Sequence, residues 1–277
     1  MSKRRMGGLR RVTTHRILEG KRGIRKAYDM MSRNYDSSKH LHITRKMEIG
    51  EEKAVEKLLR LFPPPVLDVG CGTGRYAVKM AEKGVEVVAL DVSRGMLHKT
   101  VEKARGLKAS EKVHPVVADG GNLPFRKRSV KGLVCTLTID HFENREEMVK
   151  GFSEVLAGGS LCVVTTINKK ILDSFRRLHR LPPGKISFMT DSSECFLIYE
   201  DSPPLEVFIR IAEKYFEVVT LKGCFYCYLL PFTLASLYYK TRLENLLSSF
   251  KPLLKYAGIH VILLKSFQSM EDSSPAV

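Results

Sequence analysis

The sequence predicts an α/β fold in which helices cover both faces of a mostly parallel sheet. Residues 66–69 form a short apolar strand that runs directly into a glycine-rich turn. The next two strand-like segments end in aspartates, Asp91 and Asp119, and helix-like segments lie between the strands. Because open α/β sheets bind ligands at the carboxyl ends of parallel strands, we expect the turn and both aspartates to share one edge of the sheet.

The glycine-rich turn reads Gly70-Cys71-Gly72-Thr73-Gly74, with Asp68 two residues before it. Glycine has no Cβ, so this turn can adopt left-handed backbone angles and let a ligand lie against the main chain. A phosphate-binding P-loop would need a Gly-Lys-Ser/Thr ending, but Arg75 and Tyr76 follow the last glycine. A dinucleotide-binding turn would need its third glycine at position 75. The spacing therefore favours another nucleoside cofactor.

Helices and strands are expected to alternate around this turn. An apolar stripe predicts a helix over residues 51–61, which the prolines at 63–65 end. Beyond the turn we expect helices at 75–83 and 143–156, the second stopping at Gly158 and Gly159. The expected strands are residues 85–90, 113–118, 130–139 and 160–166.

The second half of the chain is less regular. Residues 171–201 are expected to be irregular, and prolines at 203 and 204 open a helix that runs to about residue 215. Residues 216–221 and 258–267 are expected to form the last two strands. Residues 225–239 are uncharged and rich in aromatics but too short to span a bilayer. They either line an apolar pocket or form a helical cap on the core.

Two aspartates extend the pattern of the glycine-rich turn. Asp91 lies about twenty residues past the glycines, where an acidic residue can accept hydrogen bonds from both ribose hydroxyls of an adenosine. Asp119 opens the run Asp-Gly-Gly-Asn-Leu-Pro-Phe. Together, these features resemble the class I S-adenosylmethionine (SAM) methyltransferases, nearest to the ubiquinone and menaquinone methyltransferases, over residues 58–166. The resemblance implies SAM as the cofactor and a Rossmann-like seven-stranded sheet, mostly parallel with its last strand antiparallel.

Residues 27–36 resemble the tyrosine- and aspartate-containing opening of the same methyltransferases. The resemblance implies that Tyr35 covers the cofactor and that Asp119 meets the adenine amino group. The alternative for Tyr35 is that it packs its helix on the sheet. The cofactor-binding residues that the resemblance implies are Tyr35, Asp68, Gly70, Cys71, Gly72, Thr73, Gly74, Asp91, Val92, Asp119, Gly120 and Thr136.

His141 is the candidate general base, because it follows the fourth predicted strand and imidazole titrates near neutrality. The alternative is that His141 only opens the following helix, and Asp140 is the weaker candidate for the base. Cys71 is expected to be a small apolar filler with no catalytic role, since methyl transfer from SAM needs no thiol.

Charge divides the chain of 277 residues, whose formal net charge is +16. Ten basic residues and one acid, Glu19, precede Tyr28. Residues 1–26 are therefore interpreted as a basic arm with too few apolar residues to fold alone. Residues 27–277 are interpreted as a methyltransferase domain, with substrate-side insertions at 168–202 and 222–257. The arm would attract RNA phosphates or anionic lipid, and the alternatives are a solvated tail or a start codon placed too early.

The six cysteines follow no secretory signal, which favours a reducing, cytoplasmic compartment. No transmembrane segment is expected, and peripheral contact with a membrane is the alternative for an apolar surface beside cations. The pairs Cys224/Cys227 and His40/His42 are isolated, so no metal site is expected.

Two functions remain open. In the first, SAM methylates a small apolar or prenylated acceptor, such as a quinone precursor or a lipid-like molecule, by an in-line displacement that depends mostly on alignment. In the second, the acceptor is tRNA or rRNA held by the basic arm, although the fourth strand has no Asn/Asp-Pro-Pro-Tyr/Phe signature of base-amine methylation. A SAM-binding protein without catalytic activity is a third class, for which the sequence has no positive sign.

Overall fold

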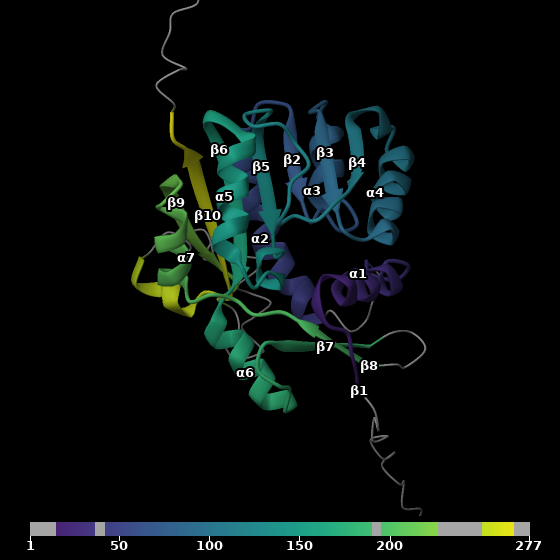
Figure 1. Ribbon diagram of the computed structural model, residues 1–277, viewed down its shortest axis with the longest axis vertical. Coiled ribbons are helices and arrows are strands. Elements are labelled where there is room, and N and C mark those ends of the chain that lie inside the picture. Colours follow the sequence, from purple (N-terminus) through teal and green to yellow (C-terminus); the bar gives the residue numbers. More distant parts are fainter. Residues whose placement is uncertain (1–14, 37–41, 190–194, 227–250, 269–277) are drawn as a thin grey trace, which may run out of the picture.

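The computed structural model describes residues 15–36, 42–189, 195–226 and 251–268. Within these residues, seven strands form one sheet in the order β4-β3-β2-β5-β6-β10-β9 (Figure 1). β10 runs antiparallel to both of its neighbours, and the remaining pairs of neighbours outside β10 are parallel. The predicted α/β fold with a mostly parallel sheet and an antiparallel last strand is therefore confirmed. The strands are Val113–Val117 (β4), Val87–Asp91 (β3), Val66–Val69 (β2), Val130–Thr136 (β5), Leu156–Ile167 (β6), Ile259–Ser266 (β10) and Phe216–Cys224 (β9).

Helices cover both faces of this sheet (Figure 1). One face carries α2 (His42–Leu59), α3 (Arg75–Ala81) and α4 (Arg94–Gly106), and the other carries α5 (Arg145–Val155) and α7 (Leu205–Ala212). Each face has its own apolar core, so the central strands must bury both of their sides. All four residues of β2 are buried, which explains why the sequence of β2 is a continuous apolar run around one aspartate.

Side-chain caps begin two of these helices, and short 3-10 helices connect other elements. Ser93 caps α4 by accepting the N–H of Met96, and Asn144 caps α5 by accepting the N–H of Glu147. Single turns of 3-10 helix lie at Ser110–Lys112 (η2) and Ile139–His141 (η3), and a longer one lies at Lys251–Tyr256 (η5). η3 directly follows β5, so it positions Asp140 and His141 at the carboxyl end of that strand.

The prediction that Gly158 and Gly159 stop a helix is wrong. α5 ends at Val155, and Leu156 is already extended and pairs with Val130 at the start of β6. The register between β5 and β6 then shifts, because Gly132 of β5 pairs with Leu161 of β6. Gly159 has a φ of +72° within this irregular stretch, so the glycine serves a strand bulge rather than a helix end.

The prediction that residues 171–201 are irregular is also wrong. This insertion forms α6 (Lys169–His179) and the hairpin strands β7 (Lys185–Met189) and β8 (Cys195–Tyr199). β8 pairs antiparallel with β7 and parallel with β1 (His15–Ile17), which gives a second, three-stranded sheet below the carboxyl edge of the main sheet (Figure 1). The partner of β8 lies in the basic arm, so no local pattern could have indicated it.

The basic arm is part of the fold from His15 onward. β1 leads into α1 (Gly20–Met31), and the boundary placed at residue 26 falls inside this helix. Leu18 donates its N–H to the carbonyl of Leu197 at 2.9 Å and is buried beside Phe196 and Ile198. The arm thus acquires its apolar partners from β8, which compensates for its own low apolar content.

Several predicted features lie outside the described residues. These are His40, Cys227, residues 1–14 of the arm and most of the aromatic stretch at 225–239. Its first two residues, Phe225 and Tyr226, are described and are buried directly after β9. Among the helices that the structure describes, none combines the length and the apolar character needed to cross a bilayer.

Candidate active site

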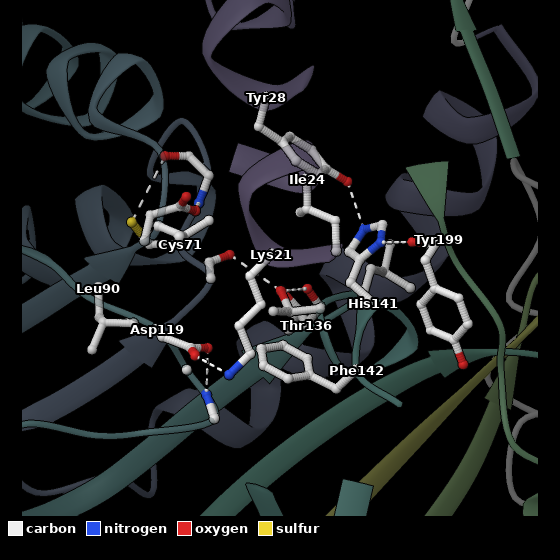
Figure 2. A pocket seen from close by; sticks show the side chains of 18 of the residues that line it. Lys21, Ile24, Tyr28, Cys71, Leu90, Asp119, Thr136, His141, Phe142 and Tyr199 are labelled. Carbon is white, nitrogen blue, oxygen red and sulfur yellow. Dashed lines mark hydrogen bonds and ion pairs between the residues drawn. The ribbon is translucent and has the colours of Figure 1, made fainter. Parts of the chain in front are cut away.

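A cavity of about 370 Å³ opens at the carboxyl ends of β2, β3 and β5. The glycine-rich turn after β2 forms one wall, and α1 lies opposite and contributes Lys21, Ile24 and Tyr28 (Figure 2). Most of the predicted site residues meet here. Those that line the cavity are Tyr35, Gly70, Cys71, Gly72, Thr73, Asp91, Val92, Asp119, Gly120, Thr136 and His141.

Asp68 and Gly74 do not line the cavity but support it. The Asp68 carboxylate is 1% exposed and accepts the N–H of Ala77 at 3.0 Å, which fixes the first turn of α3 against β2. Burial raises the pKa of Asp68 to about 7. Gly74 has a φ of +82°, and a Cβ there would lie 2.7 Å from the Thr100 side chain. Both residues therefore position the loop rather than face a ligand.

Two glycines shape the cavity wall itself. Gly70 has a φ of +68°, and a Cβ on it would lie 2.3 Å from the Thr138 side chain. Gly72 has a φ of +56°, and a Cβ there would project into open space. Since Gly72 lines the cavity, its bare main chain leaves room for a ligand to approach the backbone.

Asp91 is held rigidly at the end of β3. Its Oδ2 accepts the N–H of Gly72 at 2.9 Å, and its Oδ1 accepts the N–H of Ser93 at 2.8 Å. Burial raises the pKa of Asp91, and the two backbone donors oppose this shift by stabilising the charged form. A carboxylate oxygen can accept more than one hydrogen bond, so Asp91 keeps acceptor capacity for a ligand.

Asp119 follows β4 and forms an ion pair with Lys21 of α1 (Figure 2). Its Oδ1 also accepts the N–H of Gly121 at 3.0 Å. Phe142 packs close to Gly120 and Gly121, so an aromatic ring lies beside the carboxylate and its lysine partner. No sequence pattern singled out Lys21, because one lysine in a basic arm does not differ from its neighbours.

His141 occupies the other side of the cavity, where it bridges α1 and β8 (Figure 2). Its Nδ1 lies 2.9 Å from the carbonyl oxygen of Tyr199, and its Nε2 lies 2.6 Å from the hydroxyl of Tyr28. The Tyr28 and His141 rings meet edge to face, with centroids 5.4 Å apart. Burial lowers the pKa of His141, although Asp140 and Asp91 favour its charged form. The imidazole is therefore neutral at neutral pH.

Asp140, the weaker candidate for the base, has a structural position. Asp140 is fully buried and accepts hydrogen bonds from the Thr166 hydroxyl at 2.5 Å and from the N–H of Ile167 at 3.0 Å, which ties η3 to the end of β6. Burial raises the pKa of Asp140, and the carboxyl does not line the cavity. Cys71 is 6% exposed, and burial raises the pKa of its thiol well above the ordinary value, so the thiol stays protonated.

A buried network supports the end of β5. Glu51 of α2 is fully buried, accepts a hydrogen bond from Thr165 and pairs with Arg75 at 3.1 Å. Thr165 also accepts the N–H of Leu137 at 3.0 Å. Leu137 has a φ of +51°, an unfavourable conformation for a leucine, and it lines the cavity together with Arg75. The network thus holds a strained residue at the cavity wall.

α1 is anchored at a third point beside the cavity. The Asp29 Oδ1 accepts the Ser93 hydroxyl at 2.6 Å and the N–H of Gly95 at 2.9 Å. Ser93 and Gly95 begin α4 immediately after Asp91, so α1 is fixed to the same loop that holds that carboxylate. In the part of the chain that the structure describes, no cluster of three or more His, Cys, Asp or Glu side chains could hold a metal ion.

The seven-stranded sheet with helices on both faces is the fold of solved SAM-dependent methyltransferases. Residues 66–159 match the family model of a methyltransferase domain. The match begins at β2 and ends within β6, and it therefore includes the glycine-rich turn and both cavity aspartates.

Two curated relatives are similar over part of their length. The malonyl-[acyl-carrier protein] O-methyltransferase of Methylovorus sp. (strain MP688) is 26% identical over 176 residues, which cover 61% of this chain and 58% of that protein. The ubiquinone biosynthesis O-methyltransferase of Aliivibrio fischeri (strain MJ11) is 28% identical over 152 residues, which cover 53% of this chain and 63% of that protein. The chain thus spans less than two thirds of the length of either relative.

Two solved structures share the fold. The CcbJ methyltransferase of Streptomyces caelestis superposes with a TM-score of 0.62 at 17% identity and covers 87% of this chain and 98% of its own. Magnesium protoporphyrin IX methyltransferase of Synechocystis PCC 6803, solved with bound S-adenosylhomocysteine (SAH), gives a TM-score of 0.59 at 15% identity, with 90% and 99% covered. At these identities the likeness shows the fold alone.

Proposed function

We propose that this protein transfers a methyl group from SAM to a small acceptor that enters the cavity beside His141. The observation that carries this proposal is the division of one cavity into two chemically different sides. Asp119 lies on one side, and His141 with Tyr28 lies on the other (Figure 2). Asp91 and the bare main chain of Gly72, which hydrogen-bond to each other, also line the cavity. A cofactor and an acceptor must meet in one enclosed space for an in-line displacement.

The side with the aspartates suits the nucleoside part of SAM. Asp91 would accept hydrogen bonds from the ribose hydroxyls, because its oxygens are fixed by Gly72 and Ser93. Asp119 would accept the adenine amino group once Lys21 releases it, with Phe142 beside the base. Tyr35 lines the cavity and would cover the cofactor. SAM supplies a methyl group on a sulfonium, and the sulfur leaves as a neutral thioether without help from an acid.

The acceptor is proposed to be apolar or prenylated, such as a quinone precursor or a lipid-like molecule. Ile24 and Leu137 line the cavity and would contact an apolar acceptor. The ubiquinone biosynthesis O-methyltransferase among the relatives supports an acceptor of this kind. His141 would serve as the base for a protonated acceptor.

RNA is the second candidate for the acceptor. Arg22, Arg25 and Lys26 of α1 are exposed, and no ion pair is found for them among the described residues. An exposed cluster of cations next to the cavity would attract phosphates.

The test is to incubate the purified protein with methyl-labelled SAM and a lysate of its source organism, and then to count label in organic extract, RNA and small polar fractions. Label in the organic extract is expected. Label in RNA would favour the second candidate, and no transfer to any fraction would overturn the proposed activity. The Asp91→Asn variant serves as the control for label that does not depend on the cavity.

A further inference from the structure

The hydrogen bonds of His141 fix which nitrogen carries its proton. The Tyr199 carbonyl oxygen can only accept, so Nδ1 must donate across the 2.9 Å contact. The neutral ring then has no proton on Nε2, and the Tyr28 hydroxyl donates to it at 2.6 Å. The basic nitrogen of His141 is therefore already occupied by a tyrosine.

Tyr28 therefore occupies the basic nitrogen of His141, and both residues line the cavity. Its ring is held by Tyr35, His141 and Phe188, with centroid distances of 6.3, 5.4 and 6.2 Å. Tyr28 lines the cavity, and its hydroxyl oxygen keeps acceptor capacity after the proton has been donated to Nε2. An acceptor hydroxyl that donates to the Tyr28 oxygen would leave the contact to His141 intact.

We propose that Tyr28 is a catalytic residue that takes the proton of the acceptor while it passes its own proton to His141. The inference rests on the proposed function and names the acceptor class: a molecule whose reacting oxygen still carries a proton at neutral pH, such as a phenol or an enol. A carboxylic acid is already ionised at that pH and gains nothing from the relay.

The step balances in protons and electrons. The acceptor oxygen forms a C–O bond to the methyl carbon, the electron pair of the S–C bond stays on sulfur, and neutral SAH leaves. The acceptor proton moves to the Tyr28 oxygen, and the Tyr28 proton moves to Nε2 of His141. Tyr28 ends neutral, and the imidazolium of His141 later releases one proton to water.

The charged groups around the pair favour this direction of transfer. Asp140 of η3 and Asp91 of β3 stabilise the imidazolium, and Glu200 after β8, Tyr35 after α1 and both aspartates disfavour a tyrosinate at Tyr28. Burial keeps His141 neutral before the reaction and raises the pKa of Tyr28 well above its ordinary value. Tyr28 therefore conducts a proton without ionising itself.

Nitrogen-15 NMR of His141 tests the geometry without an acceptor. At neutral pH we expect a neutral ring protonated at Nδ1, and in Tyr28→Phe the Nε2 signal should shift because its donor is lost. Tyr215→Phe is the matched control, since its hydroxyl contacts Glu146 outside the cavity. A ring protonated at Nε2 in the wild type would overturn the relay.

The relay itself is tested with 4-nitrophenol, whose visible absorbance reports its ionisation. In the SAH complex of the wild type, we expect the ratio of ionised to neutral probe to be about tenfold higher for the bound probe than for the free probe at the same pH. Tyr28→Phe and His141→Asn should each lose this gain, and Tyr215→Phe should keep it. A bound probe whose ionisation does not change, or a site that admits no phenol at all, would contradict the inference.

Transfer from labelled SAM completes the test with 4-methylphenol and benzoate as paired acceptors. Methylation of the phenol should fall about 100-fold in Tyr28→Phe, with KM for SAM unchanged. Methylation of benzoate alone would show that the acceptor class is wrong. Loss of SAH binding by the wild type would instead overturn the proposed function, so the two failures are distinguishable by calorimetry.

Discussion

At the scale of single residues, the carboxyl groups in and around the cavity differ in how well the protein supports their charged form. Asp68 and Glu200 are buried away from the cavity, and burial raises the pKa of each to about 7. Asp91 is also buried, but two backbone N–H groups support its charged form. A buried carboxylate with little support costs stability when it ionises, whereas a supported one can serve as a permanent acceptor.

Asp68 should make the protein less stable as the pH rises. A carboxyl whose pKa is raised from 3.8 to about 7 on folding binds a proton more readily in the folded chain than in the unfolded one. Its favourable contribution is therefore full below about pH 4 and is lost towards about pH 7, by up to about 4 kcal/mol. Asp68→Asn should lose less stability than the wild type between about pH 4 and about pH 7 in urea unfolding. Parallel pH profiles for the two proteins would contradict this assignment.

Asp91 should be needed for binding of the cofactor. Asp91→Asn keeps the shape of the side chain but removes the charge that strengthens its hydrogen bonds, and we expect the Kd for SAM to rise about 100-fold. Isothermal titration calorimetry measures the change, and circular dichroism checks the fold. Glu102→Gln is the matched control, because that carboxylate lies exposed on α4 and pairs only with Lys99 among the described residues. Unchanged SAM affinity in Asp91→Asn would remove the ribose assignment.

The sequence predicted one side of the cavity at this scale and missed the other. Asp91 and Asp119 follow predicted strands, so strand order alone brought them together. Lys21 and Tyr28 meet partners 98 and 113 residues away, and their roles depend on where α1 lies. Tyr28 lies in the segment 27–36 that resembles the opening of other methyltransferases, and this was the available signal for it. Only the fold shows that its hydroxyl contacts His141.

At the scale of elements, α1 connects the two sides of the cavity. Lys21 reaches Asp119, Tyr28 reaches His141, and Asp29 holds the start of α4. Lys21 lies on the first turn of the helix, and Tyr28 and Asp29 lie together about two turns later, so a displacement of α1 would alter all of these contacts. We therefore expect α1 to couple the proposed cofactor side and the proposed acceptor side of the cavity.

Asp29→Ala should loosen this helix. The Ser93 hydroxyl and the Gly95 N–H lose their common acceptor, which should cost about 1–2 kcal/mol of stability. We expect the Kd for SAM to rise about tenfold, because α1 covers the cavity less firmly. Thermal unfolding and calorimetry measure both effects. Arg25→Ala, an exposed change on the same helix, should leave both unchanged, and a wild-type Kd in Asp29→Ala would count against the anchoring role.

The insertion after β6 shows why an element can escape sequence analysis. Ile171, Leu172, Phe175 and Leu178 are spaced as in a helix, but Arg176 lies on the buried side and obscures the apolar stripe. The guanidinium is satisfied by the carbonyls of Lys185 and Glu200 and by Asp173 and Asp201. A buried arginine with that many partners is stable only in the folded chain, and the sequence does not display those partners.

At the scale of the whole molecule, the main sheet could be predicted from the sequence and the smaller sheet of β1, β8 and β7 could not. The strands of the main sheet are apolar runs whose neighbours in space follow the alternation of strands and helices along the chain. The smaller sheet instead joins the basic arm to a hairpin inserted late in the chain. Its strands are stabilised by pairing between distant segments, which composition and local periodicity do not encode.

Two truncations should distinguish the contribution of residues 1–14 to SAH binding from that of β1 and α1. Removal of residues 1–14 should leave the Kd for SAH unchanged, because Lys21, Tyr28 and Asp29 remain. Removal of residues 1–31 should weaken SAH binding and increase the fluorescence of an apolar dye, since Phe196 and Ile198 of β8 lose Leu18 and Ala27. Calorimetry and dye fluorescence measure these changes. Equal SAH affinity in both truncated proteins would show that α1 does not contribute to the site.

The pairing of His15 with Cys195 has a consequence for biosynthesis. A ribosome adds about 5–20 residues per second, so the partner of β1 leaves the exit tunnel about 10–40 s after β1 itself. During that interval the turn after β2 and its two neighbouring strands can already fold, but the segment that will close them has nothing to pair with. A nascent chain would therefore pass through a stage in which β1 has no partner strand, because Phe196 and the rest of β8 have yet to be made. During this stage the basic arm is available to other polyanions, including the ribosome's own RNA.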